Sequence, residues 1–226
     1  MSIQQNLEKV LKNIPQNVDL IAVSKTKPIE DILKAYHLGQ RIFGENKVQE
    51  LAEKQLLLPK DIVWHFIGHL QTNKVKYIAP FVHLIHSIDS TKLLAVINKG
   101  GAKNNRIIDC LLQFYIATEE SKFGFDYEEA STLLNSKEFA EMKNIKVVGV
   151  MGMATYTTNE RLIHQEFAQL KNYFEKLKQD FFSDKPYFKE ISMGMSGDYQ
   201  IAIDEGSTMV RIGSSIFGER NYQNQI

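Results

Sequence analysis

The sequence VDLIAVSKTKPIEDILKAYHLGQRIFGE, residues 18–45, contains the pattern that decides the fold. Its mostly apolar start, 18–23, predicts a buried strand, and the segment that follows predicts a helix because its apolar side chains share one face. Pro28 stands near the first turn of this helix, and Gly39 ends it. A second apolar strand, 41–44, comes next, so the stretch predicts parallel strands joined by a helical crossover.

The alternation of strand and helix continues to the end of the chain. Further strands are predicted at 62–68, 82–88, 106–116, 145–152, 188–193 and 208–213, and helices at about 2–13, 46–57, 71–79, 89–99, 127–135, 163–181 and 199–206. Eight such units predict an α/β fold, a single (β/α)8 TIM-type barrel with an extra N-terminal helix, in one domain over residues 1–226. A doubly wound open sheet is the alternative, but it usually has fewer strands. Because the chain ends soon after the eighth strand, we expect no second domain.

Composition and charge indicate an ordinary globular protein with no general affinity for polyanions. Of the 226 residues 43% are hydrophobic, and 27 basic residues balance 27 acidic ones, so no global field favours nucleic acid or an anionic membrane. No apolar run approaches a membrane span, and the N-terminus lacks the features of a signal peptide. The lone Cys110 lies in an apolar stretch and is interpreted as packing rather than a nucleophile. We therefore expect a cytoplasmic protein.

Lys25 closes the first predicted strand, within Ser24-Lys25-Thr26-Lys27. Function in a barrel gathers where strands end, and a lysine in that place suits a Schiff-base amine. Its pKa should fall if Lys27 and Arg211 lie nearby, because like charges disfavour the ammonium. On position alone, a surface lysine at a strand end is the commoner explanation.

Two clusters of glycine and serine follow the seventh and eighth predicted strands, at residues 192–198 and 211–215. Glycines allow close backbone approach, and Ser196 adds a hydroxyl donor. The loops after these two strands commonly bind phosphate in this fold, so the clusters predict a bound phosphate. The alternative is that small residues merely cap the barrel.

Four histidines lie on or directly after the third and fourth predicted strands: His65, His69, His83 and His86. They raise a zinc hypothesis, but their spacing does not suit one helix face, and no acidic or cysteine ligand completes a set. We interpret them as satisfied or pocket-lining side chains and expect no metal. Asn46 either caps its helix or touches a ligand. Lys122, in KFGFDYEEA, is a weak candidate for the pocket mouth.

Seven motifs occur in order across nearly the whole chain: VSKTKP, FGENKVQE, WHFIGHLQTNK, HSID, ESKFGF, SMGMSGDYQIAI and GSTMVRIGSSIFGER. Together they resemble the pyridoxal phosphate homeostasis protein family. The resemblance implies a fold similar to the barrel domain of alanine racemase and of eukaryotic ornithine decarboxylase. It also implies pyridoxal 5′-phosphate (PLP) as cofactor and a role in intracellular PLP (vitamin B6) homeostasis.

Carried over position by position, the resemblance makes Lys25 the residue that holds PLP as a Schiff base. Arg211 matches the arginine that faces the pyridine nitrogen in alanine racemase-like barrels. The remaining matches bind phosphate or line the cofactor pocket: Asn46, Met193, Ser196, Gly213 and Ser214. The family often has threonine where Ser214 stands, and either hydroxyl can donate.

Two pocket-facing loops depart from the family pattern. Strand five usually carries a polar amide where Tyr115 stands, and the segment 151–156 replaces a proline-containing turn. These departures concern a shared small-molecule specificity rather than cofactor binding.

The same residues bear on catalysis, because PLP chemistry uses the pyridine ring as an electron sink. Arginine cannot accept a proton, so Arg211 implies a neutral ring nitrogen and a weak sink. Racemases of this type take an opposed tyrosine from another subunit's second domain, which we do not expect here. We predict a monomeric PLP carrier without turnover, with PLP-dependent apo-enzymes as partners. A small PLP enzyme such as an amino-acid racemase, or a cofactor-free Schiff-base aldolase, is the alternative.

Overall fold

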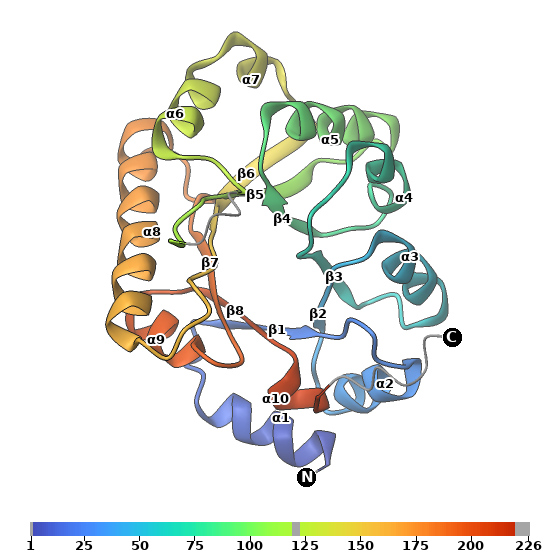
Figure 1. The fold of residues 1–226 in the computed structure, drawn as a ribbon. Coiled ribbons are helices and arrows are strands. Elements are labelled where there is room, and N and C mark those ends of the chain that lie inside the picture. Colours follow the sequence, from blue (N-terminus) through green and yellow to red (C-terminus); the bar gives the residue numbers. More distant parts are fainter. Residues whose placement is uncertain (1, 119–122, 220–226) are drawn as a thin grey trace.

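Eight parallel strands close into a barrel in this computed structural model, which describes residues 2–118 and 123–219 (Figure 1). The strands are β1 (Asp19–Val23), β2 (Ile42–Glu45), β3 (Val63–Phe66), β4 (Leu84–Ile88), β5 (Ile108–Gln113), β6 (Ile145–Met151), β7 (Glu190–Met195) and β8 (Met209–Ile212). Each strand pairs with the next along the chain, and β1 pairs in parallel with β8. The predicted (β/α)8 TIM-type barrel is confirmed.

Helices connect the strands and surround the barrel (Figure 1). They are α1 (Ile3–Lys12), α2 (Ile29–His37), α3 (Val48–Leu57), the 3-10 turn η1 (Thr72–Lys74), α4 (Val75–Ile78), α5 (Thr91–Lys103), α6 (Tyr127–Asn135), α7 (Lys137–Glu141), α8 (Glu160–Phe181), α9 (Tyr199–Asp204) and α10 (Ser214–Phe217). The extra N-terminal helix α1 lies beside α10, where Asn6 Nδ2 donates to the Ile216 carbonyl at 3.0 Å. Helix α1 is therefore part of the folded unit.

Strand side chains alternate between the barrel interior and an outer layer beneath the helices. A small apolar cluster fills the interior: Ile21, Leu84, Leu111, Val148, Met151 and Met209. The much larger outer cluster includes Ala22, Phe43 and Ile85. Because Ile21 faces inward, the period of two also directs Val23 and Lys25 inward, while Ser24 faces the helices. This alternation decides which strand-end residues reach a central site.

Short helical segments account for most of the differences from the sequence-based prediction. The predicted helix 71–79 is a 3-10 turn followed by one turn of α4, and neither α7 nor α10 was predicted. Helix α7 starts immediately after α6 because the Ser136 hydroxyl accepts from the Phe139 amide. Helix α5 runs past its predicted end through Gly101, where a Cβ would lie 2.5 Å from the Asn144 carbonyl oxygen. This tight contact excludes a larger side chain.

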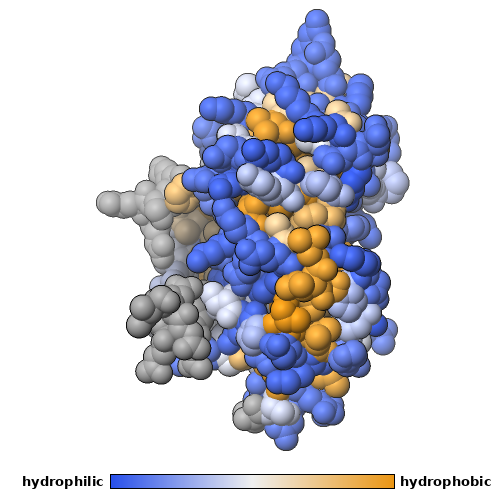
Figure 2. Space-filling view, turned by 90° about the vertical axis from the view of Figure 1, so that its right-hand side faces the viewer, coloured by the Kyte–Doolittle hydropathy of each residue, from blue (hydrophilic) through white to orange (hydrophobic). Residues whose placement is uncertain are grey.

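The outer surface is mostly hydrophilic on the side turned to the viewer in Figure 2, with an elongated hydrophobic patch. Helix α3, on this side of Figure 1, ends in two exposed leucines, Leu56 and Leu57. Within residues 2–118 and 123–219, no helix combines the length and the apolar character that crossing a membrane requires.

Candidate functional site

A cavity of about 750 Å³ opens at the end of the barrel where the strands terminate. It is lined by residues at the ends of β1, β7 and β8, by the segments that follow β1, β2, β3, β6, β7 and β8, and by Ile163 of α8. It contains six of the seven predicted site residues: Lys25, Asn46, Ser196, Arg211, Gly213 and Ser214. The fold therefore brings together side chains that lie up to 189 positions apart in the sequence.

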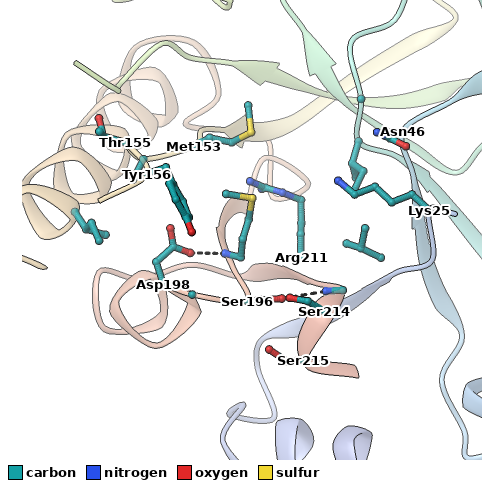
Figure 3. A pocket seen from close by; sticks show the side chains of 18 of the residues that line it. Lys25, Asn46, Met153, Thr155, Tyr156, Ser196, Asp198, Arg211, Ser214 and Ser215 are labelled. Carbon is teal, nitrogen blue, oxygen red and sulfur yellow. Dashed lines mark hydrogen bonds between the residues drawn. The ribbon is translucent and has the colours of Figure 1, made fainter. Parts of the chain in front are cut away.

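Lys25 and Arg211 extend into this cavity from neighbouring strands (Figure 3). Ile21 of β1 pairs with Arg211 of β8, and Lys25 lies two inward-facing positions further along the chain, just past the end of β1 at Val23. Lys27 also lines the cavity, and its Nζ donates to the carbonyls of Phe217, Gly218 and Glu219 at 2.9–3.1 Å. Carbonyl dipoles thus compensate the charge of Lys27.

Arg211 is held in place by two hydrogen bonds from its guanidinium. Nη1 donates to the Ser192 hydroxyl at 2.7 Å, and Nη2 donates to the Gly152 carbonyl at 3.1 Å. Burial lowers the pKa of Arg211 to about 10, while Asp198 acts in the opposite direction. The guanidinium is therefore still a cation at neutral pH and acts only as a donor.

The Arg211 contact continues into the barrel through two buried histidines. Because the Ser192 oxygen accepts from Arg211, its own hydrogen is left for His86 Nδ1, 2.9 Å away. His86 then carries its proton on Nε2 and donates to His65 Nδ1 at 3.0 Å. Burial lowers the pKa of both rings, that of His65 to about 3. Both histidines are therefore neutral near pH 7, and His86 has a partner at each ring nitrogen, as the sequence analysis expects of a satisfied side chain.

No group of three or more histidine, cysteine, aspartate or glutamate side chains converges as metal ligands would within the described part of the chain. His69 differs from the buried pair, since it lines the cavity and its Nδ1 lies 3.0 Å from Asp89.

Serine hydroxyls and backbone amides gather at another wall of the cavity, after β7 and β8. The Gly213 amide donates to Ser196 Oγ at 3.3 Å, and Ser214 and Ser215 lie beside them (Figure 3). Gly194, near the end of β7, has a φ of +92°, and a Cβ there would lie 2.5 Å from Ala202 Cβ, so this position requires glycine. The loops thus present hydroxyl and amide donors, which suit a phosphate, and the one carboxylate that lines the cavity beside them, Asp198, is bonded to the Met195 amide.

A third wall comes from the segment after β6, one of the two departures from the family pattern. Met153, Thr155 and Tyr156 line the cavity here. The buried Glu166 of α8 holds the segment, since its carboxylate accepts from the Thr155 amide and hydroxyl, both at 2.7 Å. This wall is therefore fixed by α8 rather than by a proline turn.

The structure places one predicted site residue elsewhere. Met193 is fully buried in the outer apolar layer and does not line the cavity. Its neighbour Met195 does, because the pairing of β7 with β8 shifts register between Ser192 and Met195. Met193 is thus corrected to a packing residue. A shift of register is invisible in a period-two sequence pattern.

Asp198 is the cavity residue that sequence reasoning overlooked most plainly. Its carboxylate accepts from the Met195 amide at 2.5 Å and shapes the loop, and burial raises its pKa. It was visible in the motif SMGMSGD, directly after Ser196 and Gly197. Lys122, the weak candidate for the pocket mouth, lies outside the described residues.

The cavity residues fit a small phosphorylated aromatic aldehyde. One wall offers an amine, a second a guanidinium and a third a set of hydroxyl and amide donors. The cavity volume lies within the range of small-molecule sites. Lys25 would hold the aldehyde carbon, Arg211 the ring and Ser196 with Ser214 the phosphate.

Comparison with known proteins shows which broad class of protein shares this fold. Residues 1–221 match the alanine racemase, N-terminal domain family. Among solved structures, an alanine racemase from E. faecalis shares the fold, with a TM-score of 0.77 at 15% identity over 99% of this chain and 59% of that one.

Relatives with higher sequence identity show which family within this class the chain belongs to. A pyridoxal phosphate homeostasis protein of Aquifex aeolicus (strain VF5) is 38% identical over 98% of this chain and 100% of the relative, and that of Homo sapiens is 37% identical over 97% and 83%. The PLP-bound structure of PipY from Synechococcus elongatus PCC7942 has a TM-score of 0.86 at 32% identity, covering 96% of this chain and 100% of PipY. The chain belongs to the pyridoxal phosphate homeostasis protein family, as its motifs predicted.

Proposed function

We propose that this chain is a PLP homeostasis protein that holds PLP as a Schiff base on Lys25, without catalytic turnover. The observation that carries the proposal is the meeting of Lys25, Arg211 and the two serine loops around one cavity. Its relatives are named for PLP homeostasis, and PipY has been solved with PLP bound. The predicted function and cofactor agree with both findings.

The residues divide the binding task among them. The Lys25 amine would hold PLP through a C=N bond to the aldehyde carbon, with the aldehyde oxygen released as water. Ser196, Gly213 and Ser214 would hold the phosphate, and the Arg211 guanidinium would donate towards the ring nitrogen. Asn46 lines the cavity near Lys25 (Figure 3). PLP supplies an electron sink when bound, and an arginine at its nitrogen keeps that sink weak.

Absorbance spectroscopy tests the linkage and the lack of turnover together. The protein mixed with PLP should develop a Schiff-base band that Lys25→Ala abolishes and that the exposed control Lys34→Ala retains. Full PLP occupancy in Lys25→Ala would refute the assignment. Loss of α-deuterium from an amino acid, faster than with free PLP, would refute the absence of turnover and favour a racemase.

The proposal extends to how the protein is used in the cell. We propose one PLP-binding domain over residues 1–226, acting as a cytoplasmic monomer that passes PLP to apo-enzymes. The balanced charge and the motifs support this, and the proposal assigns no role to nucleic acid or membranes. Transfer is tested by activating a PLP-dependent apo-enzyme in the presence of a phosphatase that destroys free PLP. Sedimentation of the loaded protein tests the monomer.

A further inference from the structure

A cluster of buried charged side chains lies on the far side of β1 from the cavity. Ser24 faces the helices, and its hydroxyl donates to Glu45 Oε1 at 2.7 Å. Lys54 of α3 donates to the same oxygen at 2.7 Å and to the Ser24 carbonyl at 2.8 Å. The side chains of Glu45 and Lys54 are 0% and 7% exposed. The buried ion pair of Lys54 and Glu45 thus fixes Ser24, the residue immediately before Lys25, through hydrogen bonds.

The cluster also forms a hydrogen bond with Thr26, the residue immediately after Lys25. Lys54 Nζ donates to Glu50 Oε1 at 2.7 Å, and that oxygen accepts from the Thr26 amide at 2.6 Å. Thr26 has a φ of +63°, a left-handed conformation that a β-branched residue rarely adopts. The Glu50 contact therefore helps to hold a strained turn in place.

Stability alone gives little reason for these charges to be buried here. Burial raises the pKa of Glu45, against the opposing effect of Lys54, and among the described residues Glu45 Oε2 has no hydrogen-bond partner. Apolar side chains of similar size often replace buried ion pairs without loss of stability. The cluster nonetheless makes contacts on both sides of Lys25, and these are contacts that an apolar replacement would not make.

We propose that Lys54, together with Glu45 and Glu50, positions the side chain of Lys25. By fixing the Ser24 carbonyl and the Thr26 amide, it sets the direction in which the Lys25 side chain leaves the barrel wall. This inference rests on the proposed Schiff base at Lys25. It assigns to Lys54 an effect on the covalent step and none on phosphate binding, because the phosphate loops follow β7 and β8.

The test compares PLP with pyridoxamine 5′-phosphate, which has the same ring and phosphate but no aldehyde. In Lys54→Met, the affinity for PLP and the rate of Schiff-base formation should fall about tenfold or more, the scale expected for a misplaced reactive group. The affinity for pyridoxamine 5′-phosphate should stay within about twofold. Lys171→Met, which removes an exposed lysine–glutamate pair with Glu175 on α8, should leave the binding of both ligands unchanged.

Glu50→Gln, at a partly exposed position, gives the same comparison if Lys54→Met does not fold. Unchanged PLP affinity and rate in a folded variant would overturn the inference, as would an equal loss for both ligands. The proposed function is judged separately, on the unmodified protein: a Schiff-base band there, with no difference in the variants, would remove only the positioning role.

Discussion

At the residue scale, Arg211 begins a chain of hydrogen bonds in which each residue donates to the next. Arginine donates to Ser192, Ser192 to His86, and His86 to His65. The guanidinium keeps its position because each buried acceptor is matched to a donor. The Ser192 hydroxyl bonds both Arg211 and His86, so its removal affects both residues.

Ser192→Ala should lower the free energy of unfolding by about 1–3 kcal/mol, because it leaves Arg211 and His86 each short of a partner. Urea denaturation followed by circular dichroism measures this. Ser183→Ala, at an exposed position after α8, should change the free energy by about 0.5 kcal/mol or less. Equal effects of the two substitutions would contradict the role given to Ser192.

The buried histidines predict a specific pH dependence. Burial lowers the pKa of His65 to about 3 in the folded protein, whereas the unfolded value is near 6.5. The unfolded state therefore binds more protons below pH 6.5, so stability is full above that pH and is lost as pH falls. Between pH 7 and pH 5, His65 alone should account for about 2 kcal/mol.

His86 acts in the same direction as His65, and Glu45 acts in the opposite one because burial raises its pKa. Unfolding by urea at pH 7 and pH 5 measures the sum, and the His65→Leu variant should show a smaller difference between the two pH values. The His65 ring signal followed by NMR separates the groups. A His65 ring that titrates near 6.5 would contradict the assignment.

At the element scale, the end of β7 depends on the backbone conformation of Gly194. Gly194 and Gly39 both have a positive φ, but a Cβ at Gly39 would meet nothing within 4 Å, whereas at Gly194 it would crowd Ala202. Gly39→Ala should therefore cost about 1–2 kcal/mol from strain alone, and Gly194→Ala distinctly more. Unfolding free energies measure both, and equal losses would contradict the crowding at Gly194.

The spacing of apolar residues in the sequence predicted the strands and helices that carry the site. The physical basis of that prediction also explains which residues it misplaced or overlooked. Strand ends converge in any closed barrel, so Lys25 and Ser214 could be placed together before any coordinates were known. Met193 was carried over from the family resemblance and was wrong, because it alternates with the inward-facing Ser192 and therefore packs in the outer layer. The cluster around Lys54 joins three segments through side chains that no local pattern connects.

At the scale of the whole molecule, the cavity lies where β1 meets β8 and where the loops after β6 and β7 fold over it. A ligand that contacts all of these elements should stabilise the closed barrel as a unit. At a PLP concentration 100 times the dissociation constant, linkage predicts about 2.7 kcal/mol of added stability. The melting temperature should therefore rise by roughly 5–10 °C.

Differential scanning calorimetry with and without PLP measures this shift. Pyridoxal, which lacks the phosphate, should give a smaller one at equal concentration because it leaves the serine loops without a ligand. Equal shifts for the two compounds would contradict the phosphate role of Ser196 and Ser214.

The central claim is the covalent attachment of PLP to Lys25, and one measurement addresses it most directly. The PLP-loaded protein is reduced with borohydride, digested and mapped by mass spectrometry. The account predicts a pyridoxyl adduct on the peptide that contains Lys25, at close to one per chain. An adduct carried mainly by another lysine, with Lys25 unmodified, would contradict it.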